Sequence, residues 1–211
     1  MKFIVGIDEV GRGPLAGPVA VCAVCLNTKN NDKRNIYDIS YISKMKKFFR
    51  GARDSKKLSA RKREEIFQKI KEAQRQDILR YIVRYESNEV IDKKGINFAI
   101  KSCIRKCLTG LKLNPKKTEI FLDGGLKAPK EFIYQKTIIR GDDKKLVISL
   151  ASIVAKVSRD ALMTKMAKKF PEYGFENHKG YGTQSHIRAI RKNGLSQIHR
   201  GTFCQDVDVI M

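Results

Sequence analysis

The amino-acid sequence predicts an α/β protein in which α-helices flank a mixed β-sheet. Short apolar, β-branched runs alternate along the chain with longer stretches in which apolar residues recur at helical spacing. The first two runs, 2–9 and 19–26, are joined by a turn rich in glycine and proline, which indicates a hairpin of neighbouring buried strands. A hairpin followed by alternating strands and helices is typical of a mixed sheet covered by helices.

The later elements follow from capping residues, periodicity and glycine stops. Ser59 is placed to cap a helix whose apolar positions are Ile66, Phe67, Ile70 and Ala73. The other predicted elements are, in chain order, a strand over 78–85, a helix over 96–108, strands over 119–123 and 137–139, a long helix over 148–169, and a last helix from Thr183 to about Asn193.

The chain has 211 residues, which is enough to bury a full core, and we expect a single domain over 1–211. Residues 27–53 are polar, irregular and rich in Lys and Arg, so we expect a basic surface insertion that includes a short helix. Residues 183–211 are expected to form a short C-terminal helical extension.

The charge balance points to a polyanionic partner. Lys and Arg number 44 against 22 Asp and Glu, a formal net charge of +22, and nucleic acid is the commonest polyanion available. The alternatives are a composition shared across the whole proteome, or adhesion to acidic lipid, which no amphipathic stretch with aromatic anchors supports. We therefore expect nucleic acid and not a membrane as the partner.

Five cysteines are an odd number in a chain too long to need disulfide bonds, and they lack the spacing of a zinc site. Free, buried thiols in a reducing compartment are the better interpretation. The N-terminal apolar run is short and is broken by Asp8, so it predicts neither a signal peptide nor a membrane span. We expect a cytoplasmic monomer.

Carboxylates stand at the ends of three predicted strands, each near a glycine: Asp8 with Glu9, Asp123, and Asp142 with Asp143. If these strands are neighbours, the acids meet at one edge of the sheet, where hard divalent ions such as Mg²⁺ or Mn²⁺ would offset their repulsion. Two such ions could activate water and stabilise the leaving oxygen of a phosphodiester.

Two observations weigh against the simplest form of this metal site. An Asp after a strand is ordinary turn chemistry when it stands alone. Adjacent strand residues also point to opposite faces, so Asp8 and Glu9 cannot both reach one ion from a regular strand, and Asp8 is the stronger candidate.

At these residues the chain resembles the type 2 ribonucleases H, the ribonuclease HII family. The first stretch, DEVGRGPLAGP at 8–18, and a later one, ASIVAKVSRD at 151–160, are long and specific. Shorter similar stretches stand in family order at 54–59, 95–97, 122–124, 173–175 and 178–183. The resemblance covers the chain from Ile7 to Phe203.

The resemblance implies a ribonuclease H-like fold and an endonuclease that acts on RNA–DNA hybrids and on duplex DNA containing ribonucleotides. The cut would fall 5′ of the ribonucleotide and leave a 3′-hydroxyl and a 5′-phosphate, with two Mn²⁺ or Mg²⁺ ions as cofactors. The family's catalytic and metal-binding acids match Asp8, Glu9, Asp123 and Asp142, with Asp143 as the alternative to the last.

The same resemblance assigns substrate contacts. The family's Gly-Arg-Gly segment maps onto Gly11, Arg12 and Gly13, and its substrate-reading tyrosine maps onto Tyr181. Glycine backbone can approach a 2′-hydroxyl, which distinguishes RNA from DNA, while a tyrosine ring can stack on the sugar. Lys56, near a predicted helix start, is a further candidate for binding phosphate.

For the remaining polar residues that stand out in the sequence, we expect structural roles rather than catalytic ones. We expect Asp160 to form an ion pair, and each of the three histidines, His178, His186 and His199, to be structural or superficial. The insertion at 27–53 is longer than the family's loop and could extend a duplex-binding face. The sequence stops soon after Phe203, where relatives usually continue into a helical tail that grips the duplex.

Two rival functions are compatible with parts of the sequence. A basic nucleic-acid-binding module that does not cut would use the same charge, with the acids as turn formers. A nucleotide triphosphatase is disfavoured because 11–17 lacks the G-x-x-x-x-G-K-[ST] pattern of a phosphate-binding loop.

Overall fold

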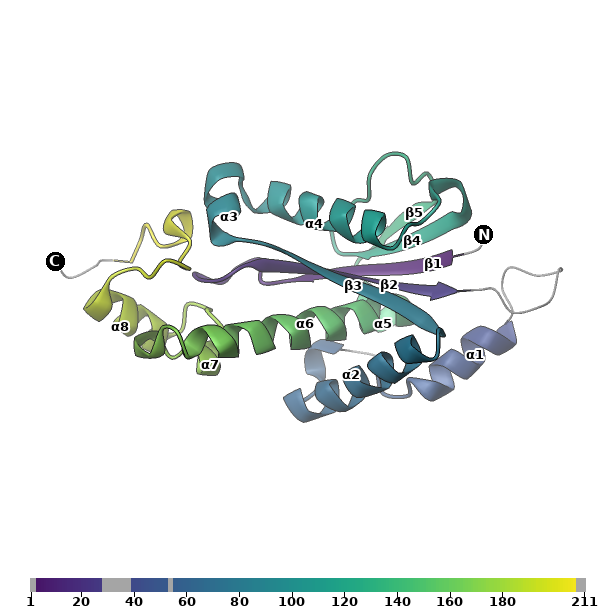
Figure 1. The fold of residues 1–211 in the computed structure, drawn as a ribbon, viewed down its shortest axis with the longest axis horizontal. Coiled ribbons are helices and arrows are strands. Elements are labelled where there is room, and N and C mark those ends of the chain that lie inside the picture. The colour runs from purple at the N-terminus through teal and green to yellow at the C-terminus, as the bar shows by residue number, and fades with distance from the viewer. Residues whose placement is uncertain (1–2, 28–38, 53–54, 208–211) are drawn as a thin grey trace.

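The core of the fold is a five-stranded mixed sheet in the order β3-β2-β1-β4-β5 (Figure 1). β1 (Phe3–Val10) and β2 (Val19–Asn27) form the predicted antiparallel hairpin. β3 (Leu79–Glu86) pairs antiparallel with β2. On the other side of β1, β4 (Thr118–Asp123) runs parallel to it, and β5 (Gln135–Ile138) runs parallel to β4. The predicted mixed sheet is therefore confirmed.

A computed structural model describes residues 3–27, 39–52 and 55–207. Within them the predicted helices form close to their expected bounds. Ser59 caps α2, its side chain accepting a hydrogen bond from the Lys62 amide, and Thr183 caps α8 in the same way through the His186 amide. The described α-helices are α1 (Ile39–Phe48), α2 (Ala60–Arg75), α3 (Asn88–Lys94), α4 (Ile96–Gly110), α5 (Gly141–Lys144), α6 (Leu146–Ala167), α7 (Phe175–His178) and α8 (Gln184–Asn193).

Helices cover both faces of the sheet (Figure 1). α6 crosses one face with α1 and α2 beside it, and α3 and α4 cover the other face. Alternate residues of β1 divide between the two cores, with Ile4 on the α6 side and Val5 and Ile7 on the α4 side. Gly6 lets α6 approach β1 closely, because a Cβ there would lie 2.2 Å from the Val147 carbonyl.

A third apolar cluster joins the end of α6 to the C-terminal helices. It contains Ala16 from the loop after β1, Met163 from α6, and Phe175 and Ile190 from α7 and α8. The loop between the first two strands is thereby fixed against the C-terminal part of the described chain.

The segment 27–53 lies partly outside the described residues. The predicted short helix is α1, and its neighbourhood is not wholly superficial, because Met45, Phe49 and Ala52 are buried in the core on the α6 side. The predicted C-terminal extension contains α8 and a single 3₁₀ turn at Gly201–Phe203 within the described residues.

All five cysteines are free and buried, as predicted. Among the described residues, every helix is too short or too polar to cross a bilayer.

Candidate active site

The strand order brings the predicted acids to one edge of the sheet. β1, β4 and β5 are adjacent and parallel, so the residues at their carboxyl ends are neighbours. Asp8 lies near the end of β1, Asp123 is the last residue of β4, and Asp142 lies in α5, four residues after β5 ends. We call these three residues and Glu9 the carboxylate cluster.

Asp8 is almost completely buried, with 2% of its surface exposed. Its Oδ1 accepts a hydrogen bond from the Glu9 amide at 2.8 Å, while its Oδ2 is buried without a hydrogen-bond partner among the described residues. Burial, together with the charges of Glu9 and Asp123, raises the pKa of the Asp8 carboxyl well above its ordinary value. The site is thus built to disfavour a negative charge unless a cation joins it.

Hydrogen bonds link the other members of the cluster. The Gly141 amide donates to Asp123 Oδ1 at 2.7 Å, which ties the start of α5 to the end of β4. Ser55 Oγ donates to Asp142 Oδ2 at 2.9 Å and also lies 2.9 Å from Ser152 Oγ on α6. The Ser152 hydroxyl opposes the rise in the Asp8 pKa, so it lies close to Asp8 as well as to the Ser55–Asp142 pair.

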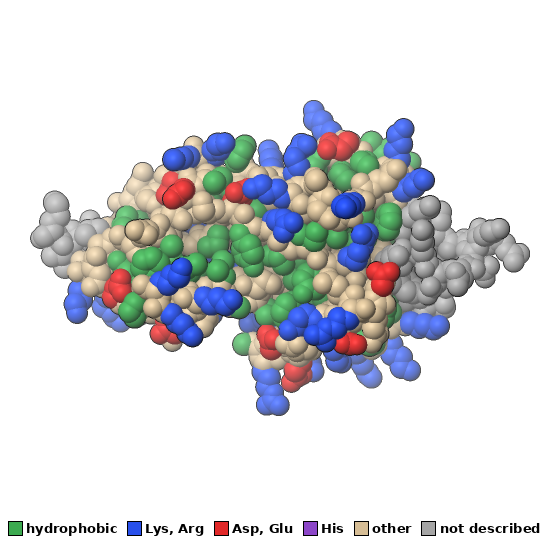
Figure 2. Space-filling view, viewed as in Figure 1, with side chains coloured by type: hydrophobic (Ala, Val, Ile, Leu, Met, Phe, Trp, Pro, Cys, Tyr) green, Lys and Arg blue, Asp and Glu red, His purple; other side chains and the backbone are tan. Residues whose placement is uncertain are grey.

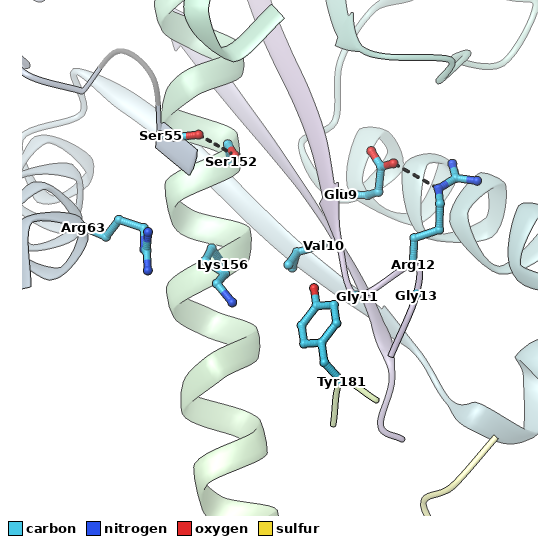
Figure 3. Close-up of a pocket in the computed structure, with 10 residues that line it drawn as sticks. All are labelled: Glu9, Val10, Gly11, Arg12, Gly13, Ser55, Arg63, Ser152, Lys156 and Tyr181. Carbon is cyan, nitrogen blue, oxygen red and sulfur yellow. Dashed lines mark hydrogen bonds and ion pairs between the residues drawn. The ribbon is translucent and has the colours of Figure 1, made fainter. Parts of the chain in front are cut away.

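Glu9 points away from Asp8. β1 stays in regular register with β2 through Val10, so adjacent side chains face opposite sides of the sheet, as the sequence indicated. The Glu9 carboxylate lies 3.3 Å from Arg12 Nε, and Arg12 Nη1 donates to Asn97 Oδ1 on α4 at 3.1 Å (Figure 3). Glu9 therefore lies toward α4, whereas Asp8 lies toward α6.

The donor set fits a hard divalent cation. Every side chain of the carboxylate cluster offers oxygen, the ligand type that Mg²⁺ and Mn²⁺ prefer, and Asp8 Oδ2 is buried without a described donor. In the described part of the chain, no three His, Cys, Asp or Glu side chains already stand in metal-binding geometry. The charges of Glu9 and Asp123 act on Asp8, but Glu9 would have to leave Arg12 to join an ion held by Asp8.

A cavity of about 370 Å³ opens beside these acids (Figure 3). Lys156 of α6, Arg63 of α2 and Tyr181 supply its side walls, and the sequence stretch from Glu9 to Gly13 supplies another. Ser55 and Ser152, which touch the carboxylate cluster, also line it. The cavity thus joins basic side chains, glycine backbone and the acid network in one space.

Two buried arginines that sequence reasoning did not single out hold the glycine-rich loop, residues 11–18. Arg159 and Arg200 are both 0% exposed. Arg159 donates to the carbonyls of Ala16, Pro18 and Lys179. Arg200 donates to the carbonyls of Gly11, Arg12 and Gly17 at 2.7–3.0 Å. Burial lowers the pKa of Arg200 to about 10, so it stays charged at neutral pH.

This bracing fixes the direction of the loop amides. In a planar trans peptide the N–H points opposite to the preceding carbonyl. Because the Gly11 and Arg12 carbonyls point to Arg200, the N–H groups of Arg12 and Gly13 point away from it. The predicted Gly-Arg-Gly segment therefore presents two donors on the side opposite the buried cation.

The fold requires glycine at one position of this segment but not at another. Gly11 has a φ of +88°, and a Cβ there would lie 2.3 Å from Arg159 Nε, so the fold itself requires glycine. At Gly13 a Cβ would meet nothing within 4 Å, and φ lies outside the left-handed region. The fold does not explain Gly13, whereas the close approach of another molecule would.

Tyr181 lies across the cavity from the glycine-rich loop (Figure 3). Its ring is 38% exposed and lies 5.8 Å from both the Lys156 ammonium and the Arg159 guanidinium. Its backbone is held by neighbouring histidines, because Tyr181 N donates to the His178 carbonyl and the Tyr181 carbonyl lies 2.9 Å from His186 Nδ1. The tyrosine is thus a fixed, accessible aromatic surface.

The three histidines, though far apart in the sequence, form one buried group that we call the histidine cluster: His178, His186 and His199. The rings of His178 and His186 stack at 4.3 Å, and the Nε2 atoms of His186 and His199 are 3.0 Å apart. Their structural role agrees with the sequence expectation, but the residue spacing gave no signal that they would meet.

The remaining predicted residues are placed as follows. Lys56 lies in a 3₁₀ turn, Ser55–Lys57, next to a residue that lines the cavity, and its side chain lies outside the described parts. Asp160 forms the expected ion pair, with Lys156 Nζ at 2.9 Å from its Oδ1. Asp143, the alternative to Asp142, is less buried than Asp142.

Comparisons with known proteins agree with this picture. A family model described as Ribonuclease HII matches residues 5–206. Similar curated proteins named Ribonuclease HII occur in Clostridium beijerinckii, 42% identical over 96% of this chain and 67% of that protein, and in Caldicellulosiruptor bescii, 40% identical over 98% of this chain and 88% of that protein.

Solved structures share the fold. The RNase HII of a PCNA complex from Archaeoglobus fulgidus matches with a TM-score of 0.73 at 23% identity, over 99% of this chain and 97% of that one. The ribonuclease H2 of Pyrococcus horikoshii matches with a TM-score of 0.67 at 26% identity, over 95% and 93%. Bst-RNase HIII, in complex with Mn²⁺, matches with a TM-score of 0.60 at 19% identity, over 91% and 63%. The expected ribonuclease H-like fold is thereby confirmed.

Proposed function

Because the chain belongs to the ribonuclease HII family, it is a metal-dependent endoribonuclease that acts on RNA–DNA hybrids, and we propose that the carboxylate cluster is its catalytic centre. The observation that carries this proposal is that Asp8, Asp123 and Asp142 lie at the carboxyl edge of three adjacent parallel strands, with Asp8 Oδ2 buried and without a hydrogen-bond partner among the described residues. A purely DNA- or RNA-binding module would have no use for such a costly arrangement, and family membership does not favour it.

We propose that Asp8, Asp123 and Asp142 hold two divalent ions, Mn²⁺ or Mg²⁺. When bound, these ions would supply an activated water and a positive charge on the leaving oxygen. Asp8 contributes its unpartnered oxygen, and the Gly141 amide keeps Asp123 oriented. Ser55 orients Asp142, which favours Asp142 over Asp143 as the fourth acid. Glu9 completes the set by exchanging its ion pair with Arg12 for the metal.

The substrate would bind in the cavity between the glycine-rich loop and Tyr181. The outward N–H groups of Arg12 and Gly13 can donate to a phosphate or to the 2′-hydroxyl of a ribonucleotide. The Tyr181 ring can stack on the adjoining sugar, where a 2′-hydroxyl changes the fit. Lys156 lines the same space and can contact phosphate, and Lys56 is a further candidate for that role.

With these contacts we propose that the enzyme also cuts on the 5′ side of a single ribonucleotide in duplex DNA, leaving a 3′-hydroxyl and a 5′-phosphate. Such a cut would begin the removal of ribonucleotides from DNA. We propose that the protein acts as a cytoplasmic monomer formed by one catalytic domain, with the basic segment 27–53 and a short C-terminal extension as its appendages.

The experiment is a nicking assay on a DNA duplex that carries one ribonucleotide, with Mn²⁺ and Mg²⁺ supplied in turn. We expect a metal-dependent nick 5′ of the ribonucleotide and no nick in all-DNA duplex. Asp142→Asn should reduce the rate about a thousandfold, since a ligand that stabilises transition-state charge contributes several kcal/mol and each 1.36 kcal/mol is about tenfold.

The matched control is Asp143→Asn, one residue away in the same short helix. This variant should keep most of the parent rate. Equal losses in the two variants would remove the assignment of Asp142, and a salt-sensitive gel shift without any product from the parent would leave only a binding protein.

A further inference from the structure

A second hollow lies on the α4 side of the sheet, away from the candidate active site cavity. It has a volume of about 660 Å³ and runs between α4 and the segment 127–131 that follows β4. Figure 2 shows Lys and Arg side chains spread over the whole molecule, including its upper part, where Figure 1 places α4 and the connection between β4 and β5. We call this hollow the α4 groove; its lining residues from α4 are Phe98, Lys101, Ser102 and Arg105.

The α4 groove is basic with an apolar floor. Lys101 and Arg105 lie one helical turn apart on α4, and Lys127 and Lys130 face them from the other wall. The one acid that lines the groove, Glu131, forms an ion pair with Arg105 at 3.6 Å in which both side chains are well exposed. Four cations thus stand against one acid, and such an exposed pair holds its partner only weakly.

An exposed aromatic ring completes this surface. Phe98 is 46% exposed, and the Lys94 ammonium lies 4.8 Å from its ring centroid. Ala128 and Pro129 add apolar surface between the cations. Two cationic walls with an exposed aromatic ring suit a nucleic acid, because its phosphates are anionic while its sugars and bases offer apolar surface.

Both walls of the groove connect through the chain to the candidate active site. Asn97, which receives the hydrogen bond from Arg12, directly precedes Phe98 at the start of α4. The other wall starts at Lys127, four residues beyond Asp123, and the Leu126 amide donates to the Asp123 carbonyl at 3.2 Å. With a helix rise of about 1.5 Å per residue, the two α4 cations, Lys101 and Arg105, lie roughly 6 Å apart along the groove.

We propose that the α4 groove binds the sugar–phosphate backbone of the nucleic-acid substrate outside the cleavage site. This inference rests on the proposed function. A strand lying between the two walls would have cations on both sides of its phosphates, which neutralise the backbone charge. The contacts are to backbone, so they strengthen binding without reading sequence.

The test is binding of the one-ribonucleotide duplex in EDTA, which prevents cleavage, measured over a series of salt concentrations. The variant carries Lys101→Gln and Lys127→Gln together, one substitution on each wall. Each lost phosphate contact lowers the slope of log K against log[salt] by about 0.9, so the slope should fall by roughly 1.8. We expect the dissociation constant to rise about tenfold at moderate salt.

The matched control carries Lys69→Gln and Arg75→Gln, which remove the same charge from α2 on the opposite face of the sheet. It should bind like the parent. The weaker binding of the groove variant would then come from the position of the lost charges and not from the lower net charge of the protein. A third arm uses a duplex shortened on one side of the ribonucleotide. Two such duplexes are made, one shortened on each side. The duplex that no longer reaches the α4 groove should bind equally well to the groove variant and to the parent.

The two proposals fail in different ways. If the parent does not nick the duplex when metal is supplied, the proposed function is wrong. If the parent nicks it but the groove variant keeps the parent's slope and dissociation constant, or loses no more than the α2 control, the α4 groove does not bind the substrate.

Discussion

Two groups of titratable side chains are buried on either side of the glycine-rich loop, and they differ in how far their buried polar atoms are hydrogen-bonded. The carboxylate cluster leaves Asp8 Oδ2 without a described partner, and the pKa of Asp8 is raised by burial. In the histidine cluster every ring nitrogen has a partner among the described residues.

The contacts of the histidine cluster fix each ring in one neutral form. His186 Nδ1 faces the Tyr181 carbonyl and must carry the proton, so His186 Nε2 accepts from His199 Nε2–H. His199 Nδ1 then accepts from the Ser196 amide at 2.8 Å. His178 Nε2 donates to the Tyr173 carbonyl, and its Nδ1 accepts from the Gly180 amide. A second proton on any of these rings would break a hydrogen bond.

The difference separates a structural group from a reactive one. A fully paired polar network rigidifies its surroundings, and here it holds the backbone of Tyr181 and of Gly180, whose carbonyl accepts from the Leu15 amide. An unpaired buried oxygen costs stability and persists where a ligand completes it. The clusters should therefore respond differently to metal and to pH.

The largest expected effect comes from removing the charge that the fold disfavours. Asp8→Asn keeps the shape of the side chain and should reduce cleavage about a thousandfold, because a metal ligand supplies several kcal/mol of transition-state stabilisation. In EDTA the variant should nevertheless have a higher free energy of unfolding than the parent at pH 7, since the folded state no longer holds a disfavoured charge. Denaturant titrations and the nicking assay measure the two effects.

Metal provides the control for this comparison. Mn²⁺ should raise the melting temperature of the parent and have a much smaller effect on Asp8→Asn, because an ion that binds only the folded state stabilises it. Normal turnover in the variant, or a parent that Mn²⁺ leaves unchanged, would contradict the assignment of Asp8.

The histidine cluster predicts a pH dependence of the opposite sign. Burial lowers the pKa of His186 and of His199 to about 4. Between about pH 6.5 and pH 4 the unfolded chain binds protons that the folded protein refuses, so the free energy of unfolding falls as the pH is lowered. The pKa of Asp8 is raised, so this residue makes the free energy of unfolding increase as the pH is lowered. The histidines are therefore measured in the Asp8→Asn background, where that opposing contribution is removed.

In that background, His199→Gln should lower the free energy of unfolding by about 2–4 kcal/mol at pH 7, because it leaves the Ser196 amide and His186 without their partner. It should also remove about half of the pH slope, since one of two low-pKa rings is lost. Ser196→Ala is the matched control: it deletes one hydroxyl contact to His199, keeps the amide contact, and should cost only about 1 kcal/mol. An unchanged slope in His199→Gln would mean that the ring does not titrate as inferred.

Local patterns predicted the sheet and its acids well. The hairpin, the cap at Ser59 and the helix at Ile96–Gly110 depend on neighbouring residues, and each was confirmed. The convergence of Asp8 and Asp123 followed once their strands were assumed to be neighbours, and the structure shows the two strands to be adjacent and parallel. The opposite directions of Asp8 and Glu9 also followed from strand geometry alone.

What the sequence could not provide are contacts between distant segments. Arg200 bonds the Gly11 carbonyl across 189 positions, and Arg159 bonds Ala16 across 143. A buried arginine is unusual, so nothing in its neighbourhood signals burial. Met45 and Phe49 likewise lie in a segment whose composition is that of a surface loop, and only the docking of α1 against the core buries them.

The smallest expected effect on stability lies in the glycine-rich loop between the two clusters. One of its glycines is required by the fold, and another is not. Gly17 has a φ of +82°, and a Cβ there would lie 2.4 Å from Sδ of the buried Met163, so Gly17→Ala should cost about 2 kcal/mol or more in the free energy of unfolding. Gly13 has open space around it, and Gly13→Ala should change that free energy by less than about 0.5 kcal/mol. If Gly13 serves the substrate, its added methyl should still raise the KM for the one-ribonucleotide duplex several-fold. A Gly13→Ala variant with the parent's stability and the parent's KM would place the substrate elsewhere in the cavity, because the only reason left for this glycine is the approach of another molecule.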